Sequence, residues 1–482
     1  MRPIISKTLI YLISVCGVAC SAEERPNIVV ILCDDLGYAD VGFNGSTDIQ
    51  TPELDELAAA GTRFSSAYVS HPFCGPSRMS LLSGRYPHPM GTPYNLAPLS
   101  YDFPESSTLG IPESEVLISK VLQQSGYRTG IVGKWHLGFE PQYHPNVRGF
   151  DDFYGFLGGG HFYFPEKYKP IYERQKKAGK SPIEEYLLPL EHNGKEVDET
   201  EYITDGLSRE AVRFVKESAE MEQPFFLYLS YNAPHSPLEA KEEDMEPYRH
   251  IKDIKRRKYA GMVAAVDRGV GELVDALREA GVFENTLIVF TSDNGGKTTL
   301  GANNAPLKKG KGSVSEGGIR VPMFFHWPKV VPSGQLFEHP VSTLDFYPTF
   351  ADLARAEIPA GKLLDGVALL DAVKKRESPR RGDMVYAVRH RDGFSEISGR
   401  RDSWKAIWDT KGGSWRLYNV DKDMAEKNDL SAQYPERLEE LKAGIRRWTA
   451  THTQPLWFHS VQEMEGWKEN EMPRYDDAFG AN

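Results

Sequence analysis

Residues 27–35 read NIVVILCDD, and this stretch decides the fold that we expect. Its first seven residues are a continuous apolar run rich in β-branched side chains, which is typical of a strand covered on both faces in a parallel sheet. Asp34 and Asp35 follow directly. Two adjacent carboxylates at the end of a buried strand are costly unless a positive group neutralises them. The pair therefore favours a metal over a helix cap or a solvated turn.

A second apolar run ends in the same way. Residues 285–292, NTLIVFTS, lead into Asp293 and Asn294. Because the carboxyl ends of parallel strands share one edge of a sheet, these two residues are expected to meet Asp34 and Asp35 there. A set of oxygen ligands without His or Cys favours a hard cation, Ca²⁺ before Mg²⁺, over zinc.

Basic and imidazole side chains follow two more predicted strands. Residues 127–132 precede Lys134 and His136, and residues 225–231 precede His235. A loop lysine is usually solvated, and a lone histidine is usually a packing residue. Their shared position just past a strand end favours a role in a site at the same edge of the sheet.

Residues 71–85, HPFCGPSRMSLLSGR, place Cys74 before a short predicted helix. Pro76 suits the first helical position, and Gly84 suits the end of the helix. The free N–H groups of the first turn, together with Arg78, favour an anion beside Cys74. A lone cysteine is more often a small core residue, but nearby basic residues indicate an exposed, electropositive thiol.

Helical periodicity alternates with these strands and predicts an α/β fold. Predicted helices cover residues 53–60, 114–124, 204–221, 259–280 and 345–354, and a further strand covers residues 321–327. The polar residues 167–200 are expected to be exposed. A change in composition at residues 359–378 predicts a linker, followed by short antiparallel strands at 384–389, 404–408 and 415–419 and an amphipathic helix at 435–449.

The length of 482 residues favours two or three domains, or one large domain with an appendage. The net charge of −11 argues against nucleic acid or an anionic membrane as the general partner. Residues 1–22 have the pattern of a signal peptide, whose apolar run is too short to span a bilayer, so we expect export. Residues 18–20 partly resemble a lipobox, which makes a lipid anchor on Cys20 the alternative. Cys33 is expected in the core.

Three motifs together resemble the type I sulfatases of the alkaline phosphatase superfamily. They are Cys-x-Pro-Ser-Arg at residues 74–78, GYRTGIVGKWHLG at 126–138 and PLKKGKGSVSEGGIRVP at 306–322. The resemblance covers nearly the whole mature chain. It implies a large, mostly parallel mixed sheet sandwiched by helices in residues 23–360. It also implies a smaller α+β unit in residues 378–482, with a four-stranded antiparallel sheet.

The resemblance also implies the chemistry of a sulfuric ester hydrolase. In that family a formylglycine-generating enzyme oxidises the cysteine to formylglycine, or 3-oxoalanine, whose hydrate attacks the sulfur of a sulfate monoester. The implied ligands of one Ca²⁺ are Asp34, Asp35, the modified Cys74, Asp293 and Asn294. The implied catalytic residues are Cys74, Arg78, Lys134, His136, His235 and Lys311. Either His235 or Lys311 protonates the leaving alcohol.

The exported context and an aromatic loop favour a sulfated sugar as substrate, with His161, Tyr163, His390 and Arg391 as candidate contacts. Two alternatives stay open. A phosphonate or phosphate ester hydrolase of the same superfamily would share the fold, the metal and the cysteine motif. A glycan-binding protein without turnover would keep the architecture alone.

Overall fold

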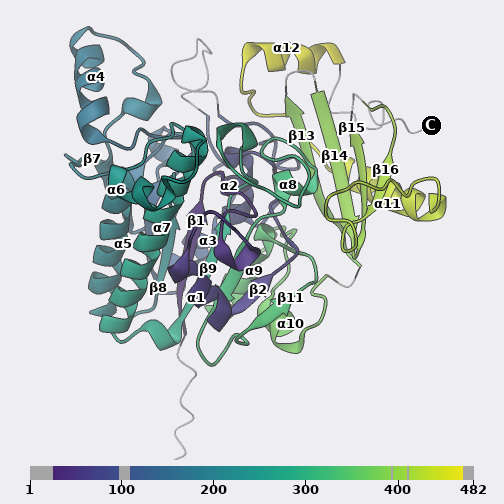
Figure 1. Ribbon diagram of the computed structural model, residues 1–482, viewed down its shortest axis with the longest axis horizontal. Helices are drawn as coiled ribbons and strands as arrows, with labels where there is room; N and C mark the ends of the chain where they lie inside the picture. The colour runs from purple at the N-terminus through teal and green to yellow at the C-terminus, as the bar shows by residue number, and fades with distance from the viewer. Residues whose placement is uncertain (1–24, 97–108, 381, 392–393, 410–411, 471–482) are drawn as a thin grey trace, which may run out of the picture.

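The computed structural model describes residues 25–96, 109–380, 382–391, 394–409 and 412–470, which form two main sheets (Figure 1). The larger sheet has ten strands in the order β11-β2-β10-β9-β1-β8-β4-β5-β6-β7, and the smaller has four in the order β13-β14-β15-β16. The expected combination of a large mixed sheet with a small antiparallel sheet is confirmed.

The strand β1 (Asn27–Cys33) lies near the centre of the large sheet. It pairs in parallel with β8 (Phe225–Ser230) on one side and with β9 (Thr286–Ser292) on the other. Every residue of these three strands is buried, as their unbroken apolar runs predict. β4 (Arg128–Lys134) and β5 (Asp152–Phe156) extend the parallel order beyond β8. These five parallel strands therefore share one carboxyl edge.

Antiparallel pairing appears toward the edges of the large sheet and makes it mixed. β10 (Met323–His326) runs antiparallel to β9. Short strands complete both edges, and two more form a separate pair: β2 (Thr62–Phe64), β11 (Gln335–Phe337), β6 (Glu191–His192), β7 (Lys195–Glu196), and the pair β3 (Ala67–Tyr68) with β12 (Val341–Ser342).

Helices cover both faces of the large sheet, because successive side chains of β1 point to opposite faces. Val29 and Ile31 pack into a core with helices α1 (Pro52–Ala60), α5 (Ile203–Ala219) and α7 (Ile254–Glu279). Figure 1 shows α5 and α7 side by side, in contact along their length. Ile28 and Val30 face a second core, formed with helices α2 (Cys74–Ser83), α3 (Ile118–Gln124) and α9 (Phe346–Leu353).

Several helix boundaries differ from the prediction. The helix predicted at residues 114–124 begins at Ile118, because the backbone is still extended at Leu117. The predicted caps Thr204 and Asp205 lie inside α5, which begins at Ile203. α7 begins five residues earlier than predicted, because the side chain of Asp253 caps it by accepting a hydrogen bond from the N–H of Lys255.

Some regular elements were not predicted. The polar segment expected to be exposed contains α4, which buries Tyr168 and Tyr172 one turn apart. The predicted linker contains α10. The remaining helical segments are α4 (Pro165–Lys177), α6 (Glu242–Met245), α8 (Glu316–Ile319), α10 (Leu370–Lys375), η1 (Gly42–Asn44), η3 (Pro141–Tyr143), η4 (Glu185–Leu187), η5 (Glu246–Tyr248), η6 (Phe283–Asn285), η7 (Thr298–Leu300) and η8 (Thr343–Asp345).

The small sheet is an antiparallel meander of β13 (Val385–Arg391), β14 (Phe394–Arg401), β15 (Trp404–Asp409) and β16 (Arg416–Asn419). The predicted helix at residues 435–449 is confirmed as α11 (Pro435–Thr449). Its buried side chains, such as Leu441 and Ile445, pack with Val388 and Ile397 of the sheet. A last helix, α12 (Val461–Asn470), follows.

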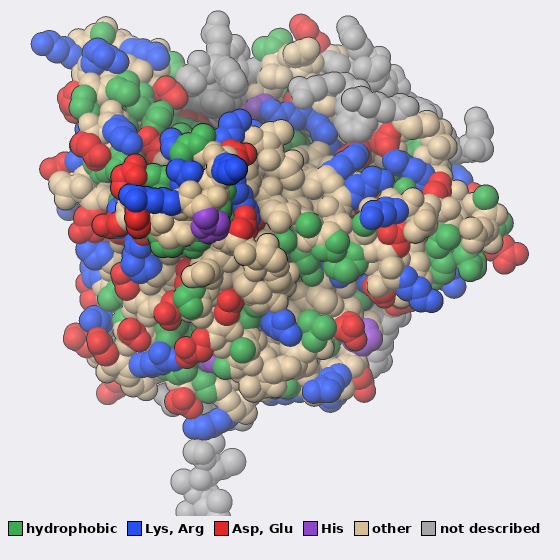
Figure 2. All heavy atoms as spheres, viewed as in Figure 1, with side chains coloured by type: hydrophobic (Ala, Val, Ile, Leu, Met, Phe, Trp, Pro, Cys, Tyr) green, Lys and Arg blue, Asp and Glu red, His purple; other side chains and the backbone are tan. Residues whose placement is uncertain are grey.

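The expectations about export fall on residues that the structure does not describe. Residues 1–22, and with them Cys20, lie outside the described ranges. Among the described residues, no helix is both long and apolar enough to cross a bilayer. On the face that Figure 2 shows, positive and negative side chains are interspersed. The division of the chain at residues 360–378 stays a prediction.

Four histidines gather around His88, three of them buried and His452 partly exposed, and we call them the histidine cluster. The ring of His88 lies 5.7 Å from His71, 5.7 Å from His390 and 4.9 Å from His452, measured between ring centroids. Burial lowers the pKa of His71 and of His390 to about 3, and it lowers the pKa of His88 and His452 well below the ordinary value. The folded protein therefore keeps these rings neutral.

The histidine cluster predicts that the free energy of unfolding falls as the pH drops below about 6.5, where an unfolded histidine starts to bind a proton. Between that pH and the folded pKa of about 3 for His71 and His390, the unfolded chain holds more protons. Each such histidine then removes up to about 1.4 kcal/mol per pH unit. Chemical denaturation between about pH 7 and pH 5 measures this slope.

The variant His390→Gln should show a slope smaller by about one proton's share. His250→Gln is the matched control, because His250 is exposed, and it should keep the wild-type slope. If His390→Gln kept that slope as well, the histidine cluster would not be a source of acid sensitivity.

Candidate active site

The helix α2 presents Cys74 at its first residue. It begins at Cys74 rather than at Pro76, which occupies the third position, where a backbone N–H still needs no partner within the helix. Gly84 ends the helix in the left-handed region with a φ of 69°, as expected. Cys74 is only 2% exposed, which corrects the expected exposed thiol: the side chains of the strand ends enclose it.

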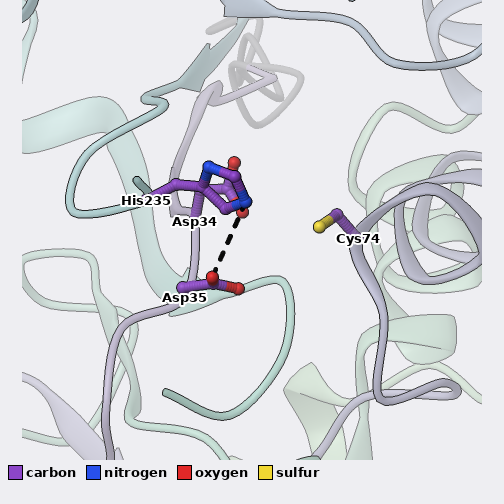
Figure 3. A group of neighbouring side chains, drawn as sticks. All are labelled: Asp34, Asp35, Cys74 and His235. Atoms are coloured by element: carbon purple, nitrogen blue, oxygen red, sulfur yellow. Dashed lines mark ion pairs between the residues drawn. The ribbon is translucent and has the colours of Figure 1, made fainter. Parts of the chain in front are cut away.

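The acidic strand ends meet as predicted. Asp34 and Asp35 follow β1, while Asp293 and Asn294 follow its neighbour β9. The N–H of Asp35 donates to Oδ1 of Asp293 over 3.3 Å, and Nδ2 of Asn294 donates to Oδ1 of Asp35 over 2.7 Å. Figure 3 shows Cys74 beside Asp34, Asp35 and His235.

Two buried basic side chains pair with these carboxylates. Nζ of Lys134 lies 2.6 Å from Oδ2 of Asp34, and Nε of Arg78 lies 2.8 Å from Oδ2 of Asp293. Lys134 and Arg78 are 0% and 1% exposed, so both charges depend on these partners.

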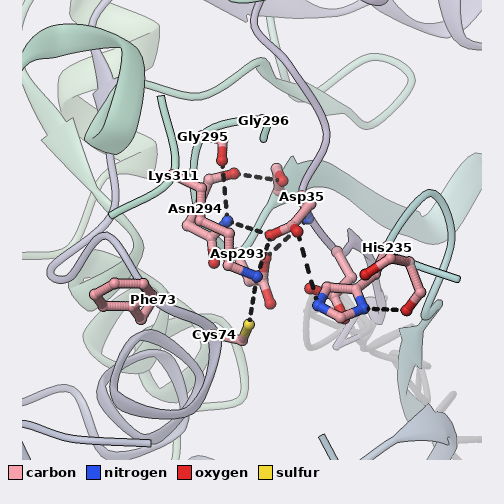
Figure 4. Close-up of polar contacts among 12 residues, drawn as sticks. Asp35, Phe73, Cys74, His235, Asp293, Asn294, Gly295, Gly296 and Lys311 are labelled. Atoms are coloured by element: carbon pink, nitrogen blue, oxygen red, sulfur yellow. Dashed lines mark hydrogen bonds and ion pairs between the residues drawn. The ribbon is translucent and has the colours of Figure 1, made fainter. Parts of the chain in front are cut away.

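Lys311 links the carboxylates to the thiol. Its Nζ lies 2.7 Å from Oδ1 of Asp35 and donates to Sγ of Cys74 over 3.2 Å (Figure 4). An ammonium group thus stands between the acidic strand ends and the predicted reactive residue.

The two predicted histidines lie at the same edge. Nε2 of His235 is 3.7 Å from Oδ2 of Asp35, and its Nδ1 bonds the carbonyl oxygen of Ser236 over 2.7 Å. His136 is buried, has a left-handed φ of 63°, and its Nδ1 has no hydrogen-bond partner within the described structure. A buried, unpartnered ring nitrogen in a strained backbone is typical of a functional site.

The pKa values of the acidic groups in the cluster shift in different directions. Burial raises the pKa of the Cys74 thiol to about 11, against the opposing effect of Lys134 and Lys311. Burial also raises the pKa of Asp293, to about 6. Burial alone would raise the pKa of Asp34 too, but Lys134 and the other cations bring it below its ordinary range. The thiol is therefore protonated near neutral pH, whereas Asp34 is ionised.

The residues present fit a hard cation. At the acidic strand ends, three buried side-chain oxygens have no hydrogen-bond partner among the described residues: Oδ1 of Asp34, Oδ2 of Asp35 and Oδ1 of Asn294. Buried oxygens without partners are rare, and two of these belong to carboxylates, which are preferred ligands of Ca²⁺. Ligand atoms of Asp34, Asp35, Cys74 and His235 also lie within 4.8 Å of one another.

The ligands that the sequence implies differ in part from the side chains that lie close enough together to share a cation. Both oxygens of Asp293 already accept hydrogen bonds, one from Arg78 and one from the N–H of Asp35. Its role as a ligand stays a prediction. His235, which the sequence placed among the catalytic residues, is near enough to the carboxylates to join the ligand set. For a hard cation the oxygen set fits better than an imidazole.

Of the four candidate substrate contacts, three are turned into the protein. Nδ1 and Nε2 of His161 bond the carbonyl oxygens of Phe162 and Leu188, and Tyr163 donates to the carbonyl oxygen of His235 over 2.8 Å. His390 is buried in the histidine cluster. Only Arg391 reaches toward the site, with its guanidinium 5.1 Å from the ring of Phe73, the neighbour of Cys74.

Two residues of the site were missed. Ser230 accepts a hydrogen bond from the guanidinium of Arg78 over 2.5 Å and donates to the backbone carbonyl oxygen of Lys134 over 2.8 Å. Tyr186 of η4 lies 6.4 Å from the ring of His235. Ser230 is the last residue of an apolar strand, and Tyr186 lies in a polar stretch. Neither residue belongs to a sequence motif that would have indicated a role in the site.

The structure thus combines an α/β fold with a cluster of buried acidic and basic side chains at the carboxyl edge of its large sheet. Comparison with known proteins identifies the family of this protein. Residues 26–356 match the family model described as Sulfatase, and residues 310–450 match the model described as N-sulphoglucosamine sulphohydrolase, C-terminal. The chain belongs to the sulfatase family of the alkaline phosphatase superfamily and is a sulfuric ester hydrolase.

Individual relatives agree with this assignment. The N-acetylgalactosamine-6-sulfatase of Mus musculus is 32% identical over 94% of this chain and 84% of its own length. The crystal structure of Ps i-CgsB in complex with k-i-k-neocarrahexaose is 53% identical, with a TM-score of 0.92 over 95% of this chain and 100% of that one. The sulfatase PsFucS1 from Pseudoalteromonas sp. is 27% identical, with a TM-score of 0.72 over 89% and 90%.

Proposed function

We propose that this protein is an exported enzyme that hydrolyses sulfate monoesters of a sulfated carbohydrate, with formylglycine made from Cys74 and one bound Ca²⁺. The observation that carries the proposal is the contact of 3.2 Å between Nζ of Lys311 and Sγ of Cys74, beside carboxylates that hold unpartnered oxygens. This contact supports a site in which the ammonium group of Lys311, residue 74 and the ligand oxygens would all contact one sulfate group.

The state of Cys74 supports its modification. A thiol with a pKa raised to about 11 carries little thiolate near neutral pH, and the thiolate is the reactive form. Attack by sulfur would also leave a thiosulfate ester without an easy route to turnover. Formylglycine supplies a hydrated aldehyde, which can form a covalent bond to the sulfuryl group and release it again. The proposal therefore requires a formylglycine-generating enzyme as a partner during maturation.

The cation and the basic residues have complementary roles. Asp34, Asp35, Asp293 and Asn294 would hold Ca²⁺, which offsets the charge of the sulfate and favours a deprotonated hydroxyl at residue 74. Arg78 and Lys134 orient that residue and the sulfate, and His136 accepts a proton there.

Lys311 and His235 are the two candidates for contact with the bridging oxygen of the sulfate ester. We assign the proton for the leaving alcohol to Lys311, because its Nζ contacts Cys74 while His235 is held against Ser236. Such a proton transfer matters most for an alcohol that leaves poorly.

A sugar as the leaving alcohol is supported by the relatives. One of them, Ps i-CgsB, was solved with an oligosaccharide bound, and another is named for a sulfated amino sugar. Arg391 is partly exposed, lies over the ring of Phe73, and has its Nε 3.9 Å from Oε1 of Glu463. We propose that it binds an anionic or hydroxyl group of the sugar, so Arg391→Met should raise KM for an oligosaccharide more than for a small aryl sulfate.

The substrate class can be tested directly. The matured protein is expected to release sulfate from at least one member of a panel of defined sulfated oligosaccharides, measured by ion chromatography. In parallel, kcat/KM should be higher for an aryl sulfate than for the matching aryl phosphonate. A clear preference for the phosphonate would overturn the proposal that the substrate is a sulfate ester. Release of sulfate from aryl sulfates alone would overturn the proposal that the leaving alcohol is a sugar.

A further inference from the structure

The loop that carries Lys311 is held from two directions, and we call residues 308–317 the lysine loop. Within the large-sheet unit, the N–H of Lys311 donates to the carbonyl oxygen of Gly296 over 3.1 Å. The N–H of Gly317 closes the lysine loop on the carbonyl oxygen of Lys308 over 2.9 Å. These bonds set the backbone of the loop on the side of the acidic strand ends.

A carboxylate of the small sheet forms hydrogen bonds to the other side of the lysine loop. Oε1 of Glu396 in β14 accepts a hydrogen bond from Nζ of Lys309 over 2.6 Å, and its Oε2 accepts one from the N–H of Val314 over 3.0 Å. One side chain thus bonds the loop on both sides of Lys311. Glu396 is 1% exposed, so its charge depends on these partners.

Glu426, which follows β16, adds a second attachment. Its Oε2 accepts the N–H of Glu316 over 3.1 Å, and its carbonyl oxygen accepts Nζ of Lys308 over 3.0 Å. The buried Lys405 of β15 lies 2.8 Å from Glu316 and 3.0 Å from Glu426. The lysine loop is therefore attached to the small sheet at both of its ends and beside its centre.

We propose that Glu396 is a positioning residue for Lys311, through which the small sheet takes part in catalysis by the large one. Lys309, the partner of Glu396, has a left-handed φ of 62°, a conformation that residues other than glycine rarely adopt. The ion pair with Glu396 holds this residue two positions from Lys311. The inference rests on the proposed function, because it needs Lys311 at the leaving oxygen.

The test compares leaving groups in the matured, full-length protein. Glu396→Gln removes the negative charge but keeps an oxygen that can accept the hydrogen bond from the N–H of Val314. Lys309→Met removes the same ion pair by changing its other partner, the half-exposed Lys309. Both variants should lose about tenfold to a hundredfold in kcat for a sugar sulfate, whose alkoxide needs a proton, with KM nearly unchanged. For 4-nitrophenyl sulfate, whose phenolate leaves without one, the loss should be much smaller.

Glu284→Gln is the matched control, because it breaks a comparable ion pair with Lys329, 2.9 Å long and well exposed. This variant should have the wild-type kcat and KM for both substrates. The double variant Glu396→Gln/Lys309→Met should lose no more than either single variant, since both remove one interaction. If Glu396→Gln does not fold, Lys309→Met decides the question alone.

Equal losses on the two substrates would show a structural role only and overturn the inference. Wild-type rates in both variants would overturn it as well, while leaving the proposed function intact. A wild-type protein that released no sulfate from any substrate would instead count against the proposed function.

Discussion

Replacing Cys74 by alanine is expected to reduce kcat/KM for a sulfate ester by at least about 10⁴-fold, as for other enzymes that lose the atom forming the covalent bond. Alanine offers no group for oxidation, and it also removes one of the two partners of Lys311, which keeps its ion pair with Asp35. The substitution is small and lies at a helix start, so the fold should persist. Initial rates with an aryl sulfate and with a sulfated oligosaccharide measure the effect.

Cys33→Ala is the matched control for that variant. Cys33 is the other cysteine among the described residues; it is buried in β1, and its side chain packs into the core. Its loss costs stability, yet the folded fraction should keep its activity. Residual turnover of more than a few per cent in Cys74→Ala would contradict the assignment of the reactive residue.

Asp34→Asn is expected to remove both the response to Ca²⁺ and most of the activity. Asp34 supplies an unpartnered oxygen to the candidate cation site and neutralises Lys134 over 2.6 Å. Losing one preorganised charge at a reaction centre costs about 10²- to 10³-fold in kcat. In the wild-type protein, Ca²⁺ at a hundred times its Kd should stabilise the folded state by about 2.7 kcal/mol.

Thermal unfolding of protein stripped with a chelator, with and without added Ca²⁺, measures that stabilisation. Asp48→Asn is the control, since Asp48 pairs with Arg256 over 2.6 Å outside the cluster, and it should keep the full response. Stabilisation by Ca²⁺ that survives in Asp34→Asn would place the cation elsewhere.

The sequence allowed the centre of the large sheet and its acidic edge to be predicted, for a physical reason. Strands buried on both faces are unbroken apolar runs, and the polar residues that end them must lie at one edge. Asp35 and Asp293 were therefore predicted to meet although they are far apart in the chain, and the N–H of Asp35 does bond Oδ1 of Asp293.

Features that depend on tertiary packing could not be predicted. The helix α4 carries many charged residues and an internal Pro170, so its buried tyrosines gave only a weak periodic signal. The attachment of Glu396 to the lysine loop depends on how the small sheet docks, which no local pattern specifies. His390 was expected to contact substrate, but docking of the same sheet buries it against His88.

The proposed mechanism depends most on the chemical state of residue 74, and mass spectrometry of the peptide that contains this residue tests that state most directly. The peptide should come from protein that releases sulfate, made in a host with a formylglycine-generating enzyme. We predict the mass of an aldehyde in place of the thiol, with a hydrazide adduct forming at residue 74 alone. An unmodified thiol in fully active protein would contradict the proposed mechanism.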